Sequence, residues 1–156
     1  TIENALKINL QMPNYIANNI EKSVHQKGLE KSIIVCGLAY KPNVEDMRDS
    51  ASFKLISDLR KKDFKVFGYD PYFSNESVEK YLVENNLKEL NFDKIENLND
   101  EHLSGISCLC VVQHHDNVKD RILEIYKKAT IPLIYDCQHK IPKESDSKSF
   151  LEYLGE

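Results

Sequence analysis

Two cations in one short segment are the residues best suited to binding chemistry. Lys41 and Arg48 lie within residues 37–50, which follow a short apolar run and precede a helical pattern. In open α/β sheets ligands bind beyond the carboxyl ends of parallel strands, where a loop can present an ammonium and a guanidinium to phosphate groups. This segment, called the motif loop below, therefore predicts an anionic ligand. The alternative is a surface loop in which Arg48 pairs with Asp46 or Asp49.

The elements that must position this loop have an α/β pattern. Residues 32–36 form a continuous apolar run, as expected for a strand of a parallel sheet covered on both faces. A helix over 51–62 and a strand over 65–69 complete a right-handed βαβ unit. Further elements are expected as a helix at 76–86, a possible strand at 88–92, a short helix at 100–104, a strand at 107–112, a helix at 117–128 and a strand at 133–135. The fold class is α/β, a Rossmann-like three-layer sandwich with a mainly parallel sheet.

The N-terminal part of the chain has a helical pattern ahead of the first expected strand. Pro13 interrupts that pattern, so two helical pieces are expected, the second beginning at Pro13. In the second piece apolar residues recur at every fourth position and line one face, namely Ile16, Ile20 and Val24. That face needs a partner, which could be the sheet of its own domain, a preceding domain or a second copy of the helix.

The domain boundary is expected at the end of this helix, where Gly28 is placed to cap it. Residues 1–28 are expected to be a linker helix and residues 29–156 one domain, because 156 residues with 41% hydrophobic content are too few for two complete domains. The sequence opens on Thr1 and already within a helical pattern. We therefore expect the chain to be a piece of a longer polypeptide.

Charge and hydropathy argue against several function classes. The net charge of -4, from 21 basic and 25 acidic residues spread along the chain, gives no basic patch for nucleic acid or for an anionic membrane. No apolar stretch approaches the ~20 residues that cross a bilayer, and no signal sequence opens the chain. We expect a cytoplasmic protein whose four cysteines, all in or beside apolar runs, are free buried thiols.

Two cysteines and two histidines near residue 110 raise the question of a metal site or a general base. Cys108 and Cys110 lie two apart on an expected strand and so face the same side. With His114 and His115 they would make a metal site, but structural zinc prefers C-x2-C loops, and a buried strand explains the cysteines more simply. Histidine titrates near neutrality, yet nothing in the sequence places a substrate proton beside either one. We expect neither a metal nor a catalytic residue here.

The motif loop lacks the glycine pattern of a dinucleotide-binding fold. That fingerprint is G-x-G-x-x-G, whereas Leu-Ala-Tyr follows Gly37. Asp70, after the second strand, could be taken for the acid that binds a ribose in such folds, but Asp70-Pro71 also makes an ordinary turn. The domain is not expected to hold NAD in the Rossmann manner.

A spaced set of residues resembles the C-terminal domain of the UDP-glucose/GDP-mannose dehydrogenase family. The set is Gly37-x-x-Tyr40-Lys41-x-x-x-x-Asp46-x-Arg48-x-Ser50 followed by Val66-x-x-Tyr69-Asp70-Pro71. Members of that family are NAD-dependent enzymes that oxidise C6 of a nucleotide sugar to a uronic acid. They consist of an N-terminal NAD domain, a central helix and a C-terminal nucleotide-sugar domain, and this chain resembles the last two.

The resemblance implies roles for particular residues. Tyr40 and Lys41 are expected to contact the UDP-sugar, and Arg48 to reach the NAD that the N-terminal domain binds. The family commonly has an arginine after the position of Asp136, where this chain has none, so His139 is expected to take its place as a substrate-binding residue, with Lys140 as an alternative. Ser50 is expected to be a helix N-cap and His115 to have a positioning role.

The implied function is UDP-sugar binding within an NAD-dependent UDP-sugar 6-dehydrogenase. UDP-N-acetylmannosamine and UDP-glucose are the leading substrates, and the resemblance implies a homodimer formed through the N-terminal helix. None of the four cysteines has the glycine-rich neighbours of the family's nucleophile, so this chain alone is expected to be inactive. The alternative is a stand-alone nucleotide-binding or oligomerisation module without catalysis.

Overall fold

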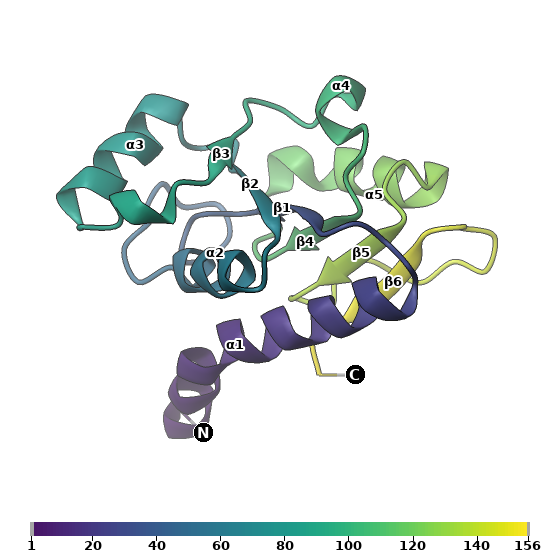
Figure 1. Cartoon of the computed structure of the whole chain (residues 1–156), viewed down its shortest axis with the longest axis horizontal. Helices are drawn as coiled ribbons and strands as arrows, with labels where there is room; N and C mark the ends of the chain where they lie inside the picture. Colours follow the sequence, from purple (N-terminus) through teal and green to yellow (C-terminus); the bar gives the residue numbers. More distant parts are fainter. Residues whose placement is uncertain (1, 156) are drawn as a thin grey trace.

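The protein is described by a computed structural model, which covers the backbone of residues 2–155 and the side chains of residues 12–155. Over this range one sheet of six parallel strands has the order β3-β2-β1-β4-β5-β6 (Figure 1). The strands are β1 Ser32–Cys36, β2 Lys65–Tyr69, β3 Asp93–Lys94, β4 Cys108–Val111, β5 Leu133–Asp136 and β6 Phe150–Tyr153. This order is that of doubly wound dinucleotide folds, and it confirms the expected Rossmann-like architecture.

Helices cover both faces of the sheet. They are α1 Ile2–Gln26, α2 Ala51–Lys61, α3 Asn75–Glu84, α4 Asp100–Leu103 and α5 Lys119–Lys128, with short 3-10 turns at Lys88–Leu90 and Asp116–Val118. The first three pack on one face over an apolar cluster that includes Ile33 and Val35, and the last two pack on the other face over a cluster that includes Ile34. Because successive strand residues point to opposite faces, each central strand contributes to both clusters, which explains its unbroken apolar sequence.

Helix α1 runs without interruption through Pro13, so the expected division into two pieces is wrong. A proline removes one backbone hydrogen bond, but tertiary packing can hold a helix together across such a defect. Here that packing is extensive, because Ala17 and Ile20 are fully buried in the cluster beneath α1–α3. The helix ends as expected at Gly28, whose φ of 64° is left-handed. The next amide, of Leu29, donates to the carbonyl of Val24 over 2.9 Å, as in a Schellman cap.

The apolar face of α1 packs on the sheet of its own domain, which was one of its three possible partners. Ile16, Ile20 and Val24 all belong to the cluster beneath α1–α3. Polar residues beside this face reach the last two strands, because Asn19 donates to the Tyr135 hydroxyl of β5 over 3.2 Å and Lys27 donates to Glu152 of β6 over 3.1 Å. Residues 12–26 are therefore part of the domain's packing.

Two strands differ from the sequence-based expectation. Residues 88–92 were expected as a possible strand, but they form a 3-10 turn that ends at Asn91, where the φ of 42° breaks an extended conformation. The strand in this region is Asp93–Lys94, only two residues long. Strand β6 was not expected. It lies at the sheet edge, and its four residues bury only alternate side chains, a pattern too short to recognise.

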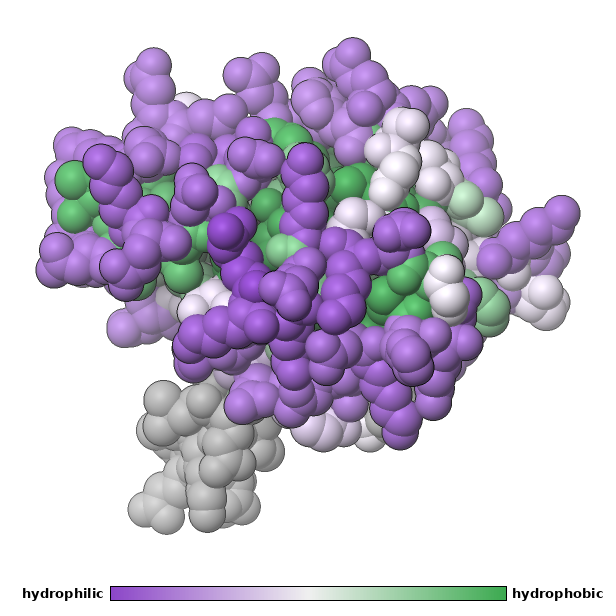
Figure 2. All heavy atoms as spheres, in the orientation of Figure 1, coloured by the Kyte–Doolittle hydropathy of each residue, from purple (hydrophilic) through white to green (hydrophobic). Residues whose placement is uncertain are grey.

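The outer surface is polar. Figure 2 shows hydrophilic residues over most of the face in view, with hydrophobic residues in small patches between them. Among the helices described, none is both long and apolar enough to cross a membrane.

Candidate functional site

The loops after β1 and β4 meet where the strand order reverses. Strand β1 leads through Gly37 into the motif loop, and β4 leads into Gln113 and the residues after it. Gly37 has a φ of 102°, and a Cβ atom there would lie 2.6 Å from the backbone nitrogen of Gln113. Only glycine permits both the conformation and the close approach. The motif loop thus starts in the crevice where open α/β folds bind ligands.

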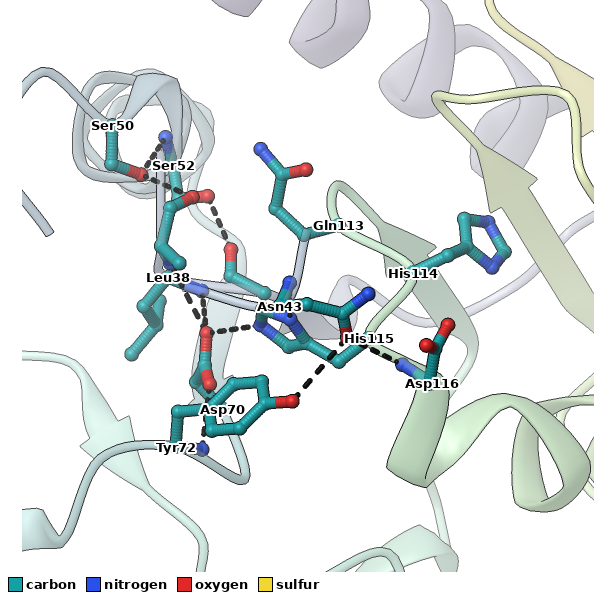
Figure 3. Close-up of polar contacts among 12 residues, drawn as sticks. Leu38, Asn43, Ser50, Ser52, Asp70, Tyr72, Gln113, His114, His115 and Asp116 are labelled. Carbon is teal, nitrogen blue, oxygen red and sulfur yellow. Dashed lines mark hydrogen bonds and ion pairs between the residues drawn. The ribbon is translucent and has the colours of Figure 1, made fainter. Parts of the chain in front are cut away.

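Asp70, directly after β2, is a buried carboxylate that holds the start of the motif loop. Its Oδ2 accepts the amide N–H of Leu38 over 2.8 Å and that of Ala39 over 3.1 Å. Its Oδ1 accepts the amide of Tyr72 over 2.9 Å. A buried charge is stable only with such partners. Asp70 is therefore the anchor of the loop, a role beyond the ordinary turn that the sequence indicates (Figure 3).

His115 is fully buried and connects Asp70 to the middle of the motif loop. Its Nε2 lies 2.9 Å from Asp70 Oδ2, and its Nδ1 lies 2.8 Å from the backbone nitrogen of Asn43. An amide N–H can only donate, so Nδ1 is the acceptor and Nε2–H donates to the carboxylate. The Tyr72 ring packs nearly perpendicular to the imidazole ring, with the ring centroids 4.6 Å apart. Both nitrogens of His115 are occupied, so it positions the loop. We call the Asp70–His115 pair the loop latch.

Asn43 joins the motif loop to the two neighbouring loops. Its side-chain Oδ1 accepts the amide of Asp116 over 2.9 Å and the hydroxyl of Tyr72 over 3.3 Å. Its φ of 61° is left-handed, a conformation that asparagine tolerates better than most residues. Three loops at the carboxyl edge of the sheet are thus fastened together (Figure 3).

The end of the motif loop is fixed by two serines at the start of α2. Ser50 is the N-cap, as expected, and its Oγ accepts the amide of Ser52 over 3.2 Å. The buried Ser52 hydroxyl donates to the carbonyl of Gly37 over 2.5 Å. Both ends of the loop are therefore tied to each other.

Tyr40 and Lys41 project from this fastened loop. The Tyr40 side chain is exposed, although its amide donates to the carbonyl of Asp46 over 2.9 Å. The Lys41 ammonium lies 5.3 Å from the centroid of the Tyr40 ring. In the described part of the chain no carboxylate pairs with Lys41. An exposed aromatic ring beside an unneutralised ammonium suits a ligand with a planar ring and phosphate groups.

Arg48 pairs with Asp46, which is the ion pair of the alternative interpretation. The guanidinium Nη2 lies 2.8 Å from Oδ2, and Nε lies 3.0 Å from Oδ1. Hydrogen bonds from the side chain and the backbone of Arg48 lower the pKa of Asp46 to about 2. The Arg48 side chain remains 80% exposed, so it can also meet a ligand at the surface.

A second Asp–His pair joins Asp136, the last residue of β5, to the loop after β4. His114 Nε2 is 2.7 Å from Oδ1 of the fully buried Asp136. The amides of Gln138, Lys140 and Ile141 also donate to this carboxylate, over 2.9, 2.7 and 2.8 Å. Burial raises the pKa of Asp136, but the hydrogen bonds from His114 and the amides outweigh it, and the net pKa is below the ordinary value. A cavity of about 280 Å³ beside this pair is lined by His114 with α5 and residues 140–142.

His139 lies apart from the loop latch. Its φ of 56° turns the exposed ring onto Tyr153 of β6, with centroids 3.7 Å apart and planes within 7°. Because β4 separates β5 from β1, His139 is on a different part of the carboxyl edge from Tyr40 and Lys41. The expected substrate-binding residues thus form two groups, Tyr40 with Lys41 and His139 alone. The sequence analysis did not identify Asp70 and Asn43 as the residues that position the first group.

The cysteines and histidines considered as a metal site are not gathered. Cys108 and Cys110 face the cluster beneath α1–α3, whereas His114 and His115 each hold a different aspartate. Within residues 12–155 no group of three or more histidine, cysteine or acidic side chains is arranged to hold a metal ion.

Comparison with known proteins gives consistent matches. Residues 34–143 match the UDP binding domain of the UDP-glucose/GDP-mannose dehydrogenase family. The UDP-N-acetyl-D-mannosamine dehydrogenase of Methanococcus vannielii is 32% identical over 143 residues, which are 88% of this chain and 30% of that protein. The UDP-glucose 6-dehydrogenase of Rickettsia felis is 25% identical over 151 residues, 96% of this chain and 32% of that protein.

Solved structures share the fold. A structure of the UDP-D-ManNAc dehydrogenase of Pyrococcus horikoshii superposes with a TM-score of 0.67 at 21% identity, over 96% of this chain and 32% of that one. The chain therefore spans about a third of the length of the proteins that it matches.

Proposed function

Since the chain belongs to the UDP-glucose/GDP-mannose dehydrogenase family, we propose that it is the nucleotide-sugar-binding domain of an NAD-dependent UDP-sugar 6-dehydrogenase. The intact enzyme would oxidise the C6 alcohol of the sugar to a carboxylate, and NAD would accept the hydrides. The NAD domain and the nucleophilic cysteine belong to a part of the polypeptide outside this chain. The chain's own residues bind and orient the nucleotide sugar, and by itself the chain is inactive.

The observation that carries this proposal is that Tyr40 and Lys41 are exposed on a loop whose backbone is fixed by the buried loop latch. Lys41 would neutralise charge on the diphosphate, and the Tyr40 ring would pack on a planar or apolar part of the ligand. A preorganised loop loses little conformational entropy when the ligand binds, which favours affinity. His139 would make a further contact with the nucleotide sugar from the segment after β5.

Arg48 is the residue proposed to reach NAD held by the adjoining domain. Its bond to Asp46 uses Nε and Nη2, so the other guanidinium N–H groups remain available to an anionic ligand. The pair orients the side chain, since an arginine held at one edge presents its opposite edge in a fixed direction.

UDP-N-acetylmannosamine is the favoured substrate and UDP-glucose the second. Support comes from the relatives, because those that share 30% or more identity over most of this chain are UDP-N-acetyl-D-mannosamine dehydrogenases. The enzyme is proposed to be cytoplasmic.

We also propose that α1 is a linker helix that contributes to a homodimer, with the domain proper at residues 29–156. The apolar face at Ile16, Ile20 and Val24 is covered by the sheet, so a second copy would contact other parts of the helix. Tyr15, which is 45% exposed, is one such position.

Calorimetric titration of the chain with UDP, GDP and NAD tests the binding proposal. We expect UDP to bind and Lys41→Ala to weaken binding at least tenfold, because a charge-assisted contact to phosphate is lost. Lys61→Ala, which removes an exposed lysine at the far end of α2, is the matched control and should leave affinity within twofold. Equal affinity in the two variants would refute the assignment of Lys41.

A stand-alone nucleotide-binding or oligomerisation module is the competing function. A parent gene that encodes the NAD domain and its cysteine in the same reading frame excludes it. An oligomerisation module would bind no nucleotide, and Lys41→Ala would then change nothing.

A further inference from the structure

Two thiols lie against each other at the carboxyl edge of β4 and β5. Cys110 belongs to β4, Cys137 follows β5 directly, and their sulfur atoms are 3.8 Å apart. The amide of Cys137 donates to the carbonyl of Val111 over 3.0 Å, which fixes Cys137 beside the neighbouring strand. Sheet pairing therefore maintains the contact between the sulfurs.

The two thiols differ in access to solvent. Cys137 is half-buried, whereas Cys110 is fully buried in the cluster beneath α1–α3. The hydrogen bond with Cys137 and the burial both raise the pKa of Cys110, so it remains a protonated thiol. A small oxidant can thus reach Cys137 and not Cys110.

We propose that Cys110 and Cys137 are an oxidation site at which a small two-electron oxidant, hydrogen peroxide, forms an intramolecular disulfide. The Cys137 sulfur, after losing its proton to solvent, attacks the peroxide, breaks the O–O bond and becomes a sulfenic acid, and the leaving hydroxide takes up a proton to give water. The Cys110 thiol then attacks the Cys137 sulfur. The S–S bond forms, the S–O bond breaks, and the hydroxyl leaves with the Cys110 proton as a second water.

Closing the bond needs a small movement. An S–S bond is about 2.05 Å long, so the sulfurs must approach by roughly 1.7 Å. Cys137 lies after the last residue of β5, where the chain turns, and a turn can move without breaking the sheet. Cys36 and Cys108 are fully buried within strands, and among the described residues the sulfur–sulfur hydrogen bond joins Cys110 to Cys137, so Cys36 and Cys108 should stay reduced.

The test is peroxide treatment of the 156-residue chain, followed by denaturation, alkylation and mass spectrometry. We expect a monomer lighter by two hydrogen atoms, with two of its four thiols protected from alkylation and released by reductant. If all four thiols are alkylated after an exposure that oxidises free glutathione, or if the linkage joins two chains, the proposal is wrong.

Variants identify which cysteines are linked. Cys108 and Cys110 share one tryptic peptide, residues 95–119, so peptide mass alone does not separate them. Cys110→Ala and Cys137→Ala should each abolish the linkage, and Cys108→Ala should keep it. If a core variant fails to fold, fragmentation of the linked wild-type peptide decides between the two positions. A bond at Cys108 would overturn the proposal.

Discussion

Two Asp–His pairs lie at the same edge of the sheet. Their histidines are adjacent in the loop after β4, yet the two aspartates belong to different segments of the chain. His115 turns to Asp70, which follows β2, and in Figure 3 His114 points away from that group. His114 Nε2 instead lies 2.7 Å from Asp136, the last residue of β5. Both aspartates are buried, and each accepts several backbone amides. The β4 loop thus fastens the segments on its two sides.

The two pairs differ in the sequence distance that they bridge. Asp70 holds Leu38 and His115, which are 32 and 45 residues away, whereas the amides that Asp136 accepts all lie within 5 residues of it. Asp136 therefore closes a local turn, which its bond to His114, 22 residues away, joins to the β4 loop. The loop latch instead holds a segment that carries the exposed side chains proposed to bind the ligand, so a buried aspartate–histidine pair here positions the proposed surface site. The comparison yields four predictions.

Removing the carboxylate of the latch should have the largest effect. Asp70→Ala leaves the amides of Leu38, Ala39 and Tyr72 without their acceptor, and the buried His115 without its partner. We expect the free energy of unfolding to fall by about 3 to 5 kcal/mol, measured by urea denaturation. A loss below about 1 kcal/mol would show that the latch is not a stabilising element.

A side chain placed in the crevice at the start of the motif loop should have the second-largest effect on stability. Gly37→Ala combines a left-handed φ with a Cβ atom 2.6 Å from a backbone nitrogen, so we expect a loss of roughly 3 kcal/mol in thermal or urea unfolding. Gly28→Ala is the matched control, since its φ of 64° is also left-handed but nothing lies within 4 Å. It should cost about 1 kcal/mol. Equal losses would mean that the contact with Gln113 is not tight.

The adjacent histidines test the comparison directly. His115→Ala should cost about 2 kcal/mol in stability and lower UDP affinity at least tenfold, because the Asn43 amide loses its acceptor and the motif loop is released. His114→Ala should cost about 1 kcal/mol and leave UDP affinity within twofold. Urea unfolding and calorimetric titration give the two quantities. If the two variants bind UDP equally, the two pairs do not differ in function.

The smallest effect concerns the exposed ion pair within the motif loop. Asp46 has a folded-state pKa of about 2, below its ordinary value of 3.8. The pair therefore stabilises the folded loop above the ordinary pKa, and this contribution is lost as the pH falls toward 2. NMR titration of the side-chain carboxyl should show this low pKa, and Arg48→Gln should return it toward the ordinary value. An unchanged pKa in that variant would contradict the assigned cause.

The sequence predicts the central elements of the fold well. Strands β1 and β2 have the expected bounds because both are apolar runs beside clear turns, and α2 is expected within one residue because Ser50 marks its start. Strands β3 and β6 escape prediction because they are edge strands of two and four residues. Tertiary pairing, and not a local pattern, makes them strands.

Of the candidate site, the sequence indicates only the exposed residues. Lys41 and Arg48 could be named as candidates from their types and spacing, and Tyr40 from the family resemblance, but the latch that holds their loop could not. Asp70 and His115 are 45 residues apart, and a single sequence contains no signal that an aspartate in a turn and a histidine after a later strand will pair. The parallel sheet alone indicates that both lie at one edge. The separation of His139 from Tyr40 likewise depends on the strand order.

Amide NMR shift mapping of the chain during titration with UDP tests the central claim most directly. The claim is that the loop latch holds the motif loop as the nucleotide-binding surface. We expect the largest shift changes in residues 38–50, with smaller changes at Asp116 and around His139, and none along the exposed face of α5. Changes centred on α5, or saturable binding that leaves residues 38–50 unperturbed, would contradict the claim.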